Sequence, residues 1–145
     1  MSLGRLRRPR GMHESSVTLA LPTDDRRRAH DFYVDVLLFE ASGTELGSDG
    51  LPEPLQFAIN AGLMLMFVPR GGFSRYVAGG RPVAEPPHTE CLLSLPRATE
   101  AEVDEVVARA EAAGATVVTA PTRKPWAYEG TFADPDGHLW SVTTA

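Results

Sequence analysis

The same order of structural patterns occurs twice along this chain of 145 residues, and that repeat limits the folds available to it. In each half, a strand pattern is followed by an amphipathic helix and then by three further strands, an order written βαβββ. A single unit of this kind leaves one face of its sheet uncovered. Two units can enclose that face, with the helices outside and a cleft inside. We therefore predict an α+β fold of two βαβββ modules that form a cleft in one chain.

The first module spans about residues 14–70. SVTLAL (16–21) predicts a strand, and Asp24 or Asp25 can cap the helix that follows. One helical stripe carries apolar side chains at Ala29, Phe32, Tyr33 and Val36. The remaining strands are predicted near 39–42, at LQFAI (55–59) and at LMLMFV (63–68).

The second module spans about residues 89–145. Its strands are predicted at ECLLSL (90–95), TVVTA (116–120), YEGTFA (128–133) and HLWSVTT (138–144). Thr99 and Glu102 have the spacing of a capping box, and Gly114 is placed to end the helix. Residues 71–88 are rich in Gly and Pro, which favours a linker over the alternative of a flap above a site. The predicted core includes Val17, Leu19, Leu21, Phe32, Val106 and Trp140.

Charge restricts the partners of this chain. Residues 1–12 are treated as a disordered or tag-like tail, and residues 13–145 as a single domain. The tail holds four of the 14 basic residues and no acidic one, so the domain contains ten basic and 19 acidic residues. Such a balance argues against nucleic acid and suits a neutral or cationic small ligand.

Hydropathy and cysteine content indicate the compartment. No apolar run approaches the length of about 20 residues that crosses a membrane, so no membrane partner is expected. The single Cys91 excludes an internal disulfide and suits a reducing, cytoplasmic location. Because Cys91 begins the apolar run CLLSL, we expect it to be buried.

Two segments resemble a known family. DDRRRAHDFYVDVLLFE (24–40) and FADPDGHLWSV (132–142), together with the repeated order, are similar to the vicinal oxygen chelate superfamily. This superfamily contains the glyoxalase, bleomycin-resistance and extradiol dioxygenase-like proteins, and the likeness covers about residues 14–144. One position departs from the pattern: the family usually has Gly where this chain has Leu38. The Asp134–Gly137 segment predicts a tight turn with a structural role, and His138 after it is expected to be structural or solvated.

The resemblance implies metal ligands that point from strands into the cleft. On this sequence, those positions fall on Thr18, on or near Leu65, on Glu90 and on Ser141. A divalent ion of this kind needs three or four His or carboxylate ligands, and only Glu90 qualifies. Shifting the register to Met64 or Met66 adds no ligand. We therefore expect no metal and no cofactor.

The resemblance also indicates which residues line the cleft. The expected set is Thr18, Ala20, Leu65, Glu90, Leu92, Trp126, Tyr128 and Ser141. Glu90 is the candidate catalytic residue, as a base or as a counter-charge for a cationic ligand, and the alternative is a solvent-exposed or arginine-paired side chain at a strand start. Trp126 and Tyr128 could stack on a flat ligand, with core packing as their alternative.

Three functions follow from this reading. The favoured one is a bleomycin-resistance-like protein that binds a small molecule, cationic or aromatic, in a metal-free cleft. The alternatives are a metal-dependent lyase or isomerase or a ring-cleaving dioxygenase of the same superfamily, and an acid–base enzyme that uses Glu90 without metal. Whether the protein is an enzyme is left open by the residues.

A homodimer is expected, because family members commonly dimerise and Phe73, Tyr76 and Val77 would form an exposed apolar patch.

Overall fold

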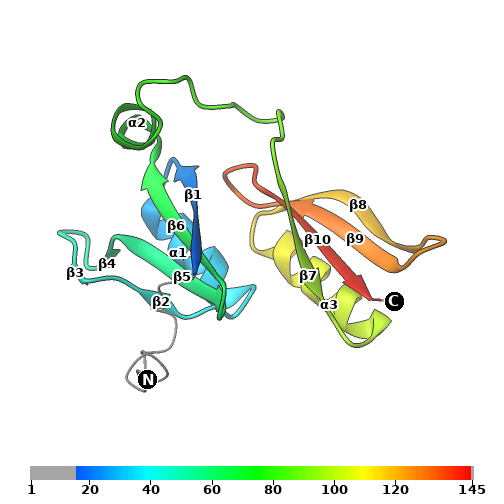
Figure 1. The fold of residues 1–145 in the computed structure, drawn as a ribbon. Coiled ribbons are helices and arrows are strands. Elements are labelled where there is room, and N and C mark those ends of the chain that lie inside the picture. The colour runs from blue at the N-terminus through cyan, green and yellow to red at the C-terminus, as the bar shows by residue number, and fades with distance from the viewer. Residues whose placement is uncertain (1–15, 145) are drawn as a thin grey trace, which may run out of the picture.

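The computed structural model describes residues 16–144, which fold into two units of the same topology (Figure 1). The first unit contains β1 (Val17–Thr23), α1 (Arg26–Asp35), β2 (Ala41–Ser42), β5 (Leu55–Asn60) and β6 (Leu63–Pro69). Its sheet has the strand order β1-β6-β5-β2, with β1 parallel to β6 and the other pairs antiparallel. A short hairpin of β3 (Glu45–Leu46) and β4 (Pro52–Glu53) precedes β5.

The second unit repeats this arrangement. It contains β7 (Leu92–Pro96), α3 (Glu100–Ala112), β8 (Thr116–Arg123), β9 (Tyr128–Ala133) and β10 (Leu139–Thr144). Its sheet has the order β7-β10-β9-β8, with β7 parallel to β10. The predicted α+β fold class with two βαβββ modules is therefore confirmed. The predicted tail of residues 1–12 lies outside the described residues.

Both long helices begin at the caps that the sequence indicates. The Asp25 carboxylate accepts a hydrogen bond from the Arg28 N–H at 3.0 Å. The Thr99 hydroxyl accepts from the Glu102 N–H at 3.1 Å, and the Glu102 carboxylate accepts from the Thr99 N–H at 3.3 Å. These reciprocal bonds confirm the capping box, which satisfies backbone donors that have no partner within the helix. Gly114 follows α3 with a φ of 105°, the left-handed conformation that ends many helices.

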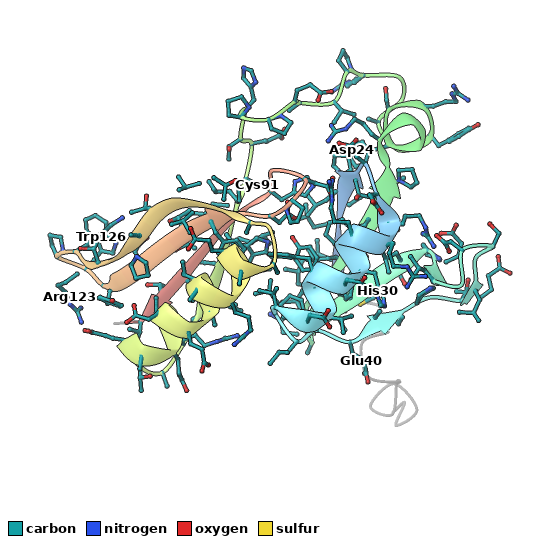
Figure 2. The ribbon with its side chains drawn as sticks, turned by 180° about the vertical axis from the view of Figure 1, so that it is seen from behind. Asp24, His30, Glu40, Cys91, Arg123 and Trp126 are labelled. Atoms are coloured by element: carbon teal, nitrogen blue, oxygen red, sulfur yellow. The ribbon has the colours of Figure 1, made fainter. Side chains whose placement is uncertain are left out.

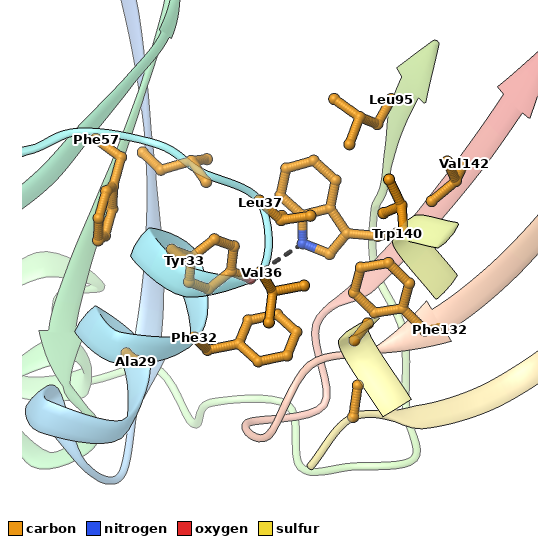
Figure 3. Packing of buried hydrophobic residues seen from close by; sticks show 14 of the residues in the cluster. Ala29, Phe32, Tyr33, Val36, Leu37, Phe57, Leu95, Phe132, Trp140 and Val142 are labelled. Carbon is orange, nitrogen blue, oxygen red and sulfur yellow. Dashed lines mark hydrogen bonds between the residues drawn. The ribbon is translucent and has the colours of Figure 1, made fainter. Parts of the chain in front are cut away.

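One hydrophobic core joins the two modules, and the apolar side of α1 forms part of it (Figure 3). The ring of Phe32 on α1 lies 6.0 Å from that of Phe132 on β9, and Tyr33 lies 6.0 Å from Trp140 on β10. The indole N–H of Trp140 also donates to the Tyr33 hydroxyl at 3.0 Å. Helix α1 therefore packs between its own sheet and the sheet of the second module.

The prediction that both helices lie only on the outside is therefore wrong for α1, because Phe32 and Tyr33 are buried between the two sheets while Asp31 on its other side is exposed. The reason is that Tyr33 contacts both sheets: its ring lies 4.9 Å from that of Phe67 in its own sheet and 6.0 Å from that of Trp140 in β10. The cleft formed by the two modules remains a prediction. Both sheets turn their helix-covered faces toward the shared core. Their other faces, called here the uncovered faces, point away from it.

The predicted core residues are mostly buried. Leu21, Phe32, Val106 and Trp140 belong to the core, and Leu19 packs against it while partly buried. Val17 is 64% exposed, so its assignment to the core is wrong. The burial of β1 increases along the strand, and Val17 lies at the exposed end.

The two modules are joined by residues 70–91, called here the connector, which cross above the end of β1 (Figure 1). The connector begins with two short turns, α2 (Arg70–Gly72) and the π-helical η2 (Phe73–Val77). Arg70 holds its start, because Nε donates to the Asp24 carboxylate at 2.8 Å and Nη1 lies 3.8 Å from the Glu85 carboxylate. The connector is thus tied by ion pairs to the end of β1 and to its own middle.

Cys91, at the end of the connector, is not placed as the sequence predicts. Strand β7 begins at Leu92, so Cys91 lies just before the sheet and its side chain is exposed. The prediction that Cys91 is buried is therefore wrong. Among residues 16–144, no helix combines the length and apolar character needed to cross a membrane.

Candidate functional site

A cavity of about 380 Å³ lies where both modules meet the connector. Three segments line it: residues 19–22 of β1, parts of the connector, and residues 137–139 before and at the start of β10. Its lining is largely apolar and includes Leu21, Phe73, Val83 and Leu139. This volume and this lining are typical of small-molecule sites, which often form between structural units.

A few polar side chains converge on the same cavity. They are Arg81, His88, Thr89, Glu90, Cys91 and His138. Arg81 and Glu90 are its strongly basic and its acidic member. The cavity can therefore offer an apolar surface together with an anionic and a cationic contact.

The turn at Asp134–Gly137 fixes one wall of the cavity to the end of β1. The Asp136 carboxylate is buried and accepts from the Thr23 hydroxyl at 2.6 Å and from the Asp24 N–H at 2.9 Å. The Arg28 guanidinium donates to the same carboxylate at 2.8 Å, which balances its charge. These contacts join the two modules beside the cavity.

Asp134 organises the turn from within. Its carboxylate accepts the backbone N–H groups of Asp136 at 2.9 Å and His138 at 2.8 Å, and it also accepts the Tyr33 hydroxyl. Burial raises the pKa of Asp134 above its ordinary value and raises the pKa of Tyr33, so the phenol keeps the proton that it donates. The contacts give this turn the structural role that the sequence predicts.

Two features of the turn bear directly on the cavity. His138 lines it, and because a carbonyl can only accept, His138 Nε2 donates to the Pro22 carbonyl at 2.7 Å. Gly137 has a φ of 93°, and a Cβ at this position would lie 2.7 Å from Cγ of Pro86 in the connector. The absence of a side chain at Gly137 therefore lets the connector pack onto the turn.

The predicted site residues of module one are divided between the two faces of their sheet. Thr18 pairs with Met64 and Ala20 pairs with Met66 on the uncovered face. Leu65 points to the opposite face and is fully buried in the core. The assignment of Leu65 to the cleft is therefore wrong by one residue, because neighbouring strand residues point to opposite faces.

The predicted residues of module two are also separated. Ser141 lies on the uncovered face, where Ser94 of β7 and Thr131 of β9 are its neighbours, and Leu92 lies on the same face. Glu90 precedes β7, so it does not belong to the sheet and lies exposed at the cavity. Of the eight predicted residues, Ala20 and Glu90 line the cavity.

The two predicted aromatic residues lie outside the cavity. The Tyr128 hydroxyl donates to the Asp104 carboxylate of α3 at 2.5 Å, so Tyr128 lies on the helix-covered face and its assignment to the cleft is wrong. Trp126 is 69% exposed between β8 and β9, at the end of module two distant from Cys91 (Figure 2). For Tyr128, core packing is the alternative that the structure supports.

Glu129 is a carboxylate on the uncovered face that the sequence reasoning missed. It accepts from the Trp126 indole N–H at 2.7 Å and from the Ser141 hydroxyl at 3.3 Å, and Lys124 Nζ lies 3.8 Å away. Phe132 is buried on the helix-covered face, and residue 129, three positions earlier in β9, points to the opposite face, which also carries Ser141. The alternation of side chains along β9 could therefore have predicted that Glu129 lies on the uncovered face. The Glu129 carboxylate therefore already has hydrogen-bond and ionic partners within the chain.

Comparison with known proteins identifies the family. The model of the Glyoxalase/Bleomycin resistance protein/Dioxygenase superfamily matches residues 16–142, and this chain belongs to that superfamily. Among solved structures, a glyoxalase-related enzyme from Fulvimarina pelagi is similar with a TM-score of 0.75 and 21% identity, over 91% of this chain and 88% of that one. A comparison with curated proteins gave no match.

Two further solved structures carry informative descriptions. TnmS3 from Streptomyces sp. CB03234, described as an antibiotic binding protein, has 25% identity and a TM-score of 0.60, over 89% of this chain and 93% of its own. A lactoylglutathione lyase from Agrobacterium tumefaciens has 26% identity and a TM-score of 0.61, over 91% of this chain and 94% of its own. These neighbours include a binding protein and an enzyme, so the shared fold does not decide between the two functions.

The residues do not fit the divalent metal that the family resemblance implies. On the uncovered faces, Thr18 and Ser141 present hydroxyl groups, and Met64 and Met66 present thioethers, which are poor ligands for such an ion. His88, Glu90, Cys91 and His138 share the cavity lining, yet within residues 16–144 no three His, Cys, Asp or Glu side chains form a group that could hold a metal.

Proposed function

We propose that this protein binds a small organic molecule in the cavity between β1, the connector and the turn before β10. The observation that carries the proposal is the cavity itself: about 380 Å³, mainly apolar, and lined by both modules. The antibiotic-binding description of TnmS3 supports the same class of function.

The cavity lining indicates the character of the ligand. Leu21, Phe73 and Leu139 favour an apolar or aromatic body. Glu90 offers a contact for a cationic group, and the net charge of −5 of the whole chain favours the approach of cations over anions. Because Glu90 is exposed, we assign it to ligand contact rather than to acid–base catalysis.

We further propose that binding needs no metal. The lactoylglutathione lyase neighbour favours the alternative of a metal-dependent lyase, but the donor set described above opposes it. Metal analysis of protein dialysed against a weak chelator should give well below one equivalent per chain. One equivalent of a divalent metal that supports turnover would favour the lyase.

The binding proposal is tested by filling the cavity. Ala84 lines it from the connector, and Ala84→Trp should abolish the thermal shift produced by compounds from a panel of antibiotics and aromatic amines. Ala108→Trp is the matched control, because Ala108 lines a separate hollow between α3 and β8. Equal binding by the wild type and Ala84→Trp would place the site elsewhere.

A further inference from the structure

We propose that the cavity accepts a short peptide, or a compound with a peptide-like amide, as an added strand along the free edge of β1. This inference rests on the proposed function and names the class of ligand for the same cavity. It is carried by the direction of the backbone groups in β1.

Strand β1 is the edge of its sheet, because it pairs with β6 and with no other strand of the described residues. Peptide groups of successive strand residues point to opposite sides. The Val17 N–H donates to the Gly62 carbonyl at 2.9 Å, toward β6, and Pro22 directs its carbonyl away from β6 to His138 at 2.7 Å. By alternation, the backbone N–H and C=O of Ala20 point to the free edge.

The free edge faces the cavity. Residues 19–22 of β1 line it, and so does His138, which marks the direction in which the Pro22 carbonyl points. Alternation turns the backbone N–H and C=O of Ala20 away from the β1–β6 ladder, and outside that ladder no group of residues 16–144 hydrogen-bonds to them. Strand addition requires free backbone donors and acceptors on a sheet edge, and Ala20 provides one of each beside an apolar cavity.

Pro22 limits how the added strand can pair. It has no N–H, so the free edge offers a donor and an acceptor at Ala20 but only an acceptor at residue 22, where His138 already occupies the carbonyl. One extended residue of a ligand supplies the complementary N–H and C=O for Ala20. The ligand is therefore short, with one central amide-bearing residue at Ala20.

The remaining lining suits the rest of such a ligand. Phe73, Val83 and Leu139 supply apolar contacts for a side chain. Arg81 and Glu90 line the same cavity, and they form no ion pair with each other or with other residues of 16–144. A zwitterionic peptide would bring a carboxylate to Arg81 and an ammonium group to Glu90.

The test uses the tripeptide Ala-Val-Ala with free termini and two variants of the protein. Ala20→Pro removes the free-edge N–H and leaves the β1–β6 pairing intact, because the N–H of residue 20 is not part of that ladder. Thr18→Pro is the matched control on the same edge, since Thr18 does not line the cavity. Two-dimensional ¹H–¹⁵N spectra report folding, and the Gly137 amide reports binding.

We expect Ala-Val-Ala to shift the Gly137 amide in a dose-dependent way, and Ala20→Pro to weaken that binding at least fivefold. Thr18→Pro should change it less than twofold, and N-methylation of the central peptide nitrogen should weaken it as Ala20→Pro does. Equal affinity of Ala20→Pro and the wild type would overturn strand addition. So would an Ala20 amide that is already protected from hydrogen exchange in the ligand-free protein.

The two proposals fail in different ways. If other small molecules shift the cavity amides but no peptide does, strand addition is wrong and the proposed function stands. If neither peptides nor other compounds shift these amides, both are wrong. A peptide that binds equally well with N-methylated nitrogens uses the cavity without the edge, which also overturns the inference.

Discussion

Leu38 shows how a single residue can depart from its family's pattern at a cost in free energy. It follows α1 with a φ of 61°, in the left-handed region where glycine is favoured and a leucine is strained. Its side chain is 70% exposed, so it recovers little of that cost by burial. The family's usual Gly at this position is explained by this backbone conformation.

Leu38→Gly should therefore raise the free energy of unfolding by about 1 kcal/mol, since relief of the left-handed strain exceeds the added entropy of the unfolded chain. Leu46→Gly is the control, because Leu46 is similarly exposed but lies in β3 without a positive φ, and it should lower stability slightly. Urea unfolding measures both. A loss of stability in Leu38→Gly as large as in the control would contradict this account.

Asp134 should give the protein an unusual dependence on pH. Burial raises its pKa in the folded state above the ordinary value of 3.8, so the folded state binds this proton more tightly than the unfolded state. Stability from this group is complete below pH 3.8 and decreases as the pH rises through the folded-state pKa. The unfolding free energy of the wild type minus that of Asp134→Asn should therefore fall as the pH is raised from about 3.8. A difference that rises over this range would show that the pKa is lowered.

At the level of elements, the Asp134–Gly137 turn connects the two modules. Removal of the Asp136 carboxylate leaves the Asp24 N–H without its acceptor and Arg28 without its counter-charge, while the Thr23 hydroxyl keeps only its longer bond to the Asp25 carbonyl at 3.1 Å. Asp136→Ala should cost about 2–3 kcal/mol of unfolding free energy, because Arg28 is partly exposed and can reach water. Chemical denaturation measures this loss. Asp35→Ala is the control, because Asp35 is an exposed aspartate on α1. Similar effects of both substitutions would mean that the turn does not join the modules.

The elements themselves could be predicted from the sequence, whereas their partners could not. Pro135 and Gly137 indicate the turn because their backbone preferences are local, and Thr99 with Glu102 indicates a helix start for the same reason. The contact of Asp136 with Thr23 joins residues 113 positions apart and depends on how the modules pack. Leu65 was misplaced because an apolar strand carries no polar residue to fix which face is buried.

At the level of the whole molecule, the packing of α1 between the sheets decides where a site can form. Thr18 and Ser141 lie on the uncovered faces, which are turned away from the shared core around α1, and neither residue lines the cavity. The cavity forms instead where the connector crosses the ends of both modules. Glu90 belongs to this cavity because β7 begins after it, which strand pattern alone did not show.

The homodimer remains a prediction at this scale. Tyr76 is 78% exposed in the connector, and Val17 and Leu92 are exposed at the starts of the two edge strands. Exposed apolar side chains favour association with a second copy. Light scattering at high micromolar concentration should give twice the mass of the 15.7 kDa chain. A monomer mass under these conditions would contradict the prediction.

The central claim is that the cavity between the modules and the connector binds a small organic molecule. The most direct measurement is a ¹H–¹⁵N spectrum of the labelled protein, titrated with compounds that raise its melting temperature. Saturable shifts should cluster at residues that line the cavity, among them Ala20, His88 and Gly137, while Val117 and Glu111 beside the hollow of α3 and β8 stay unchanged. Shifts confined to the uncovered faces of the two sheets, or none with any stabilising compound, would contradict the claim.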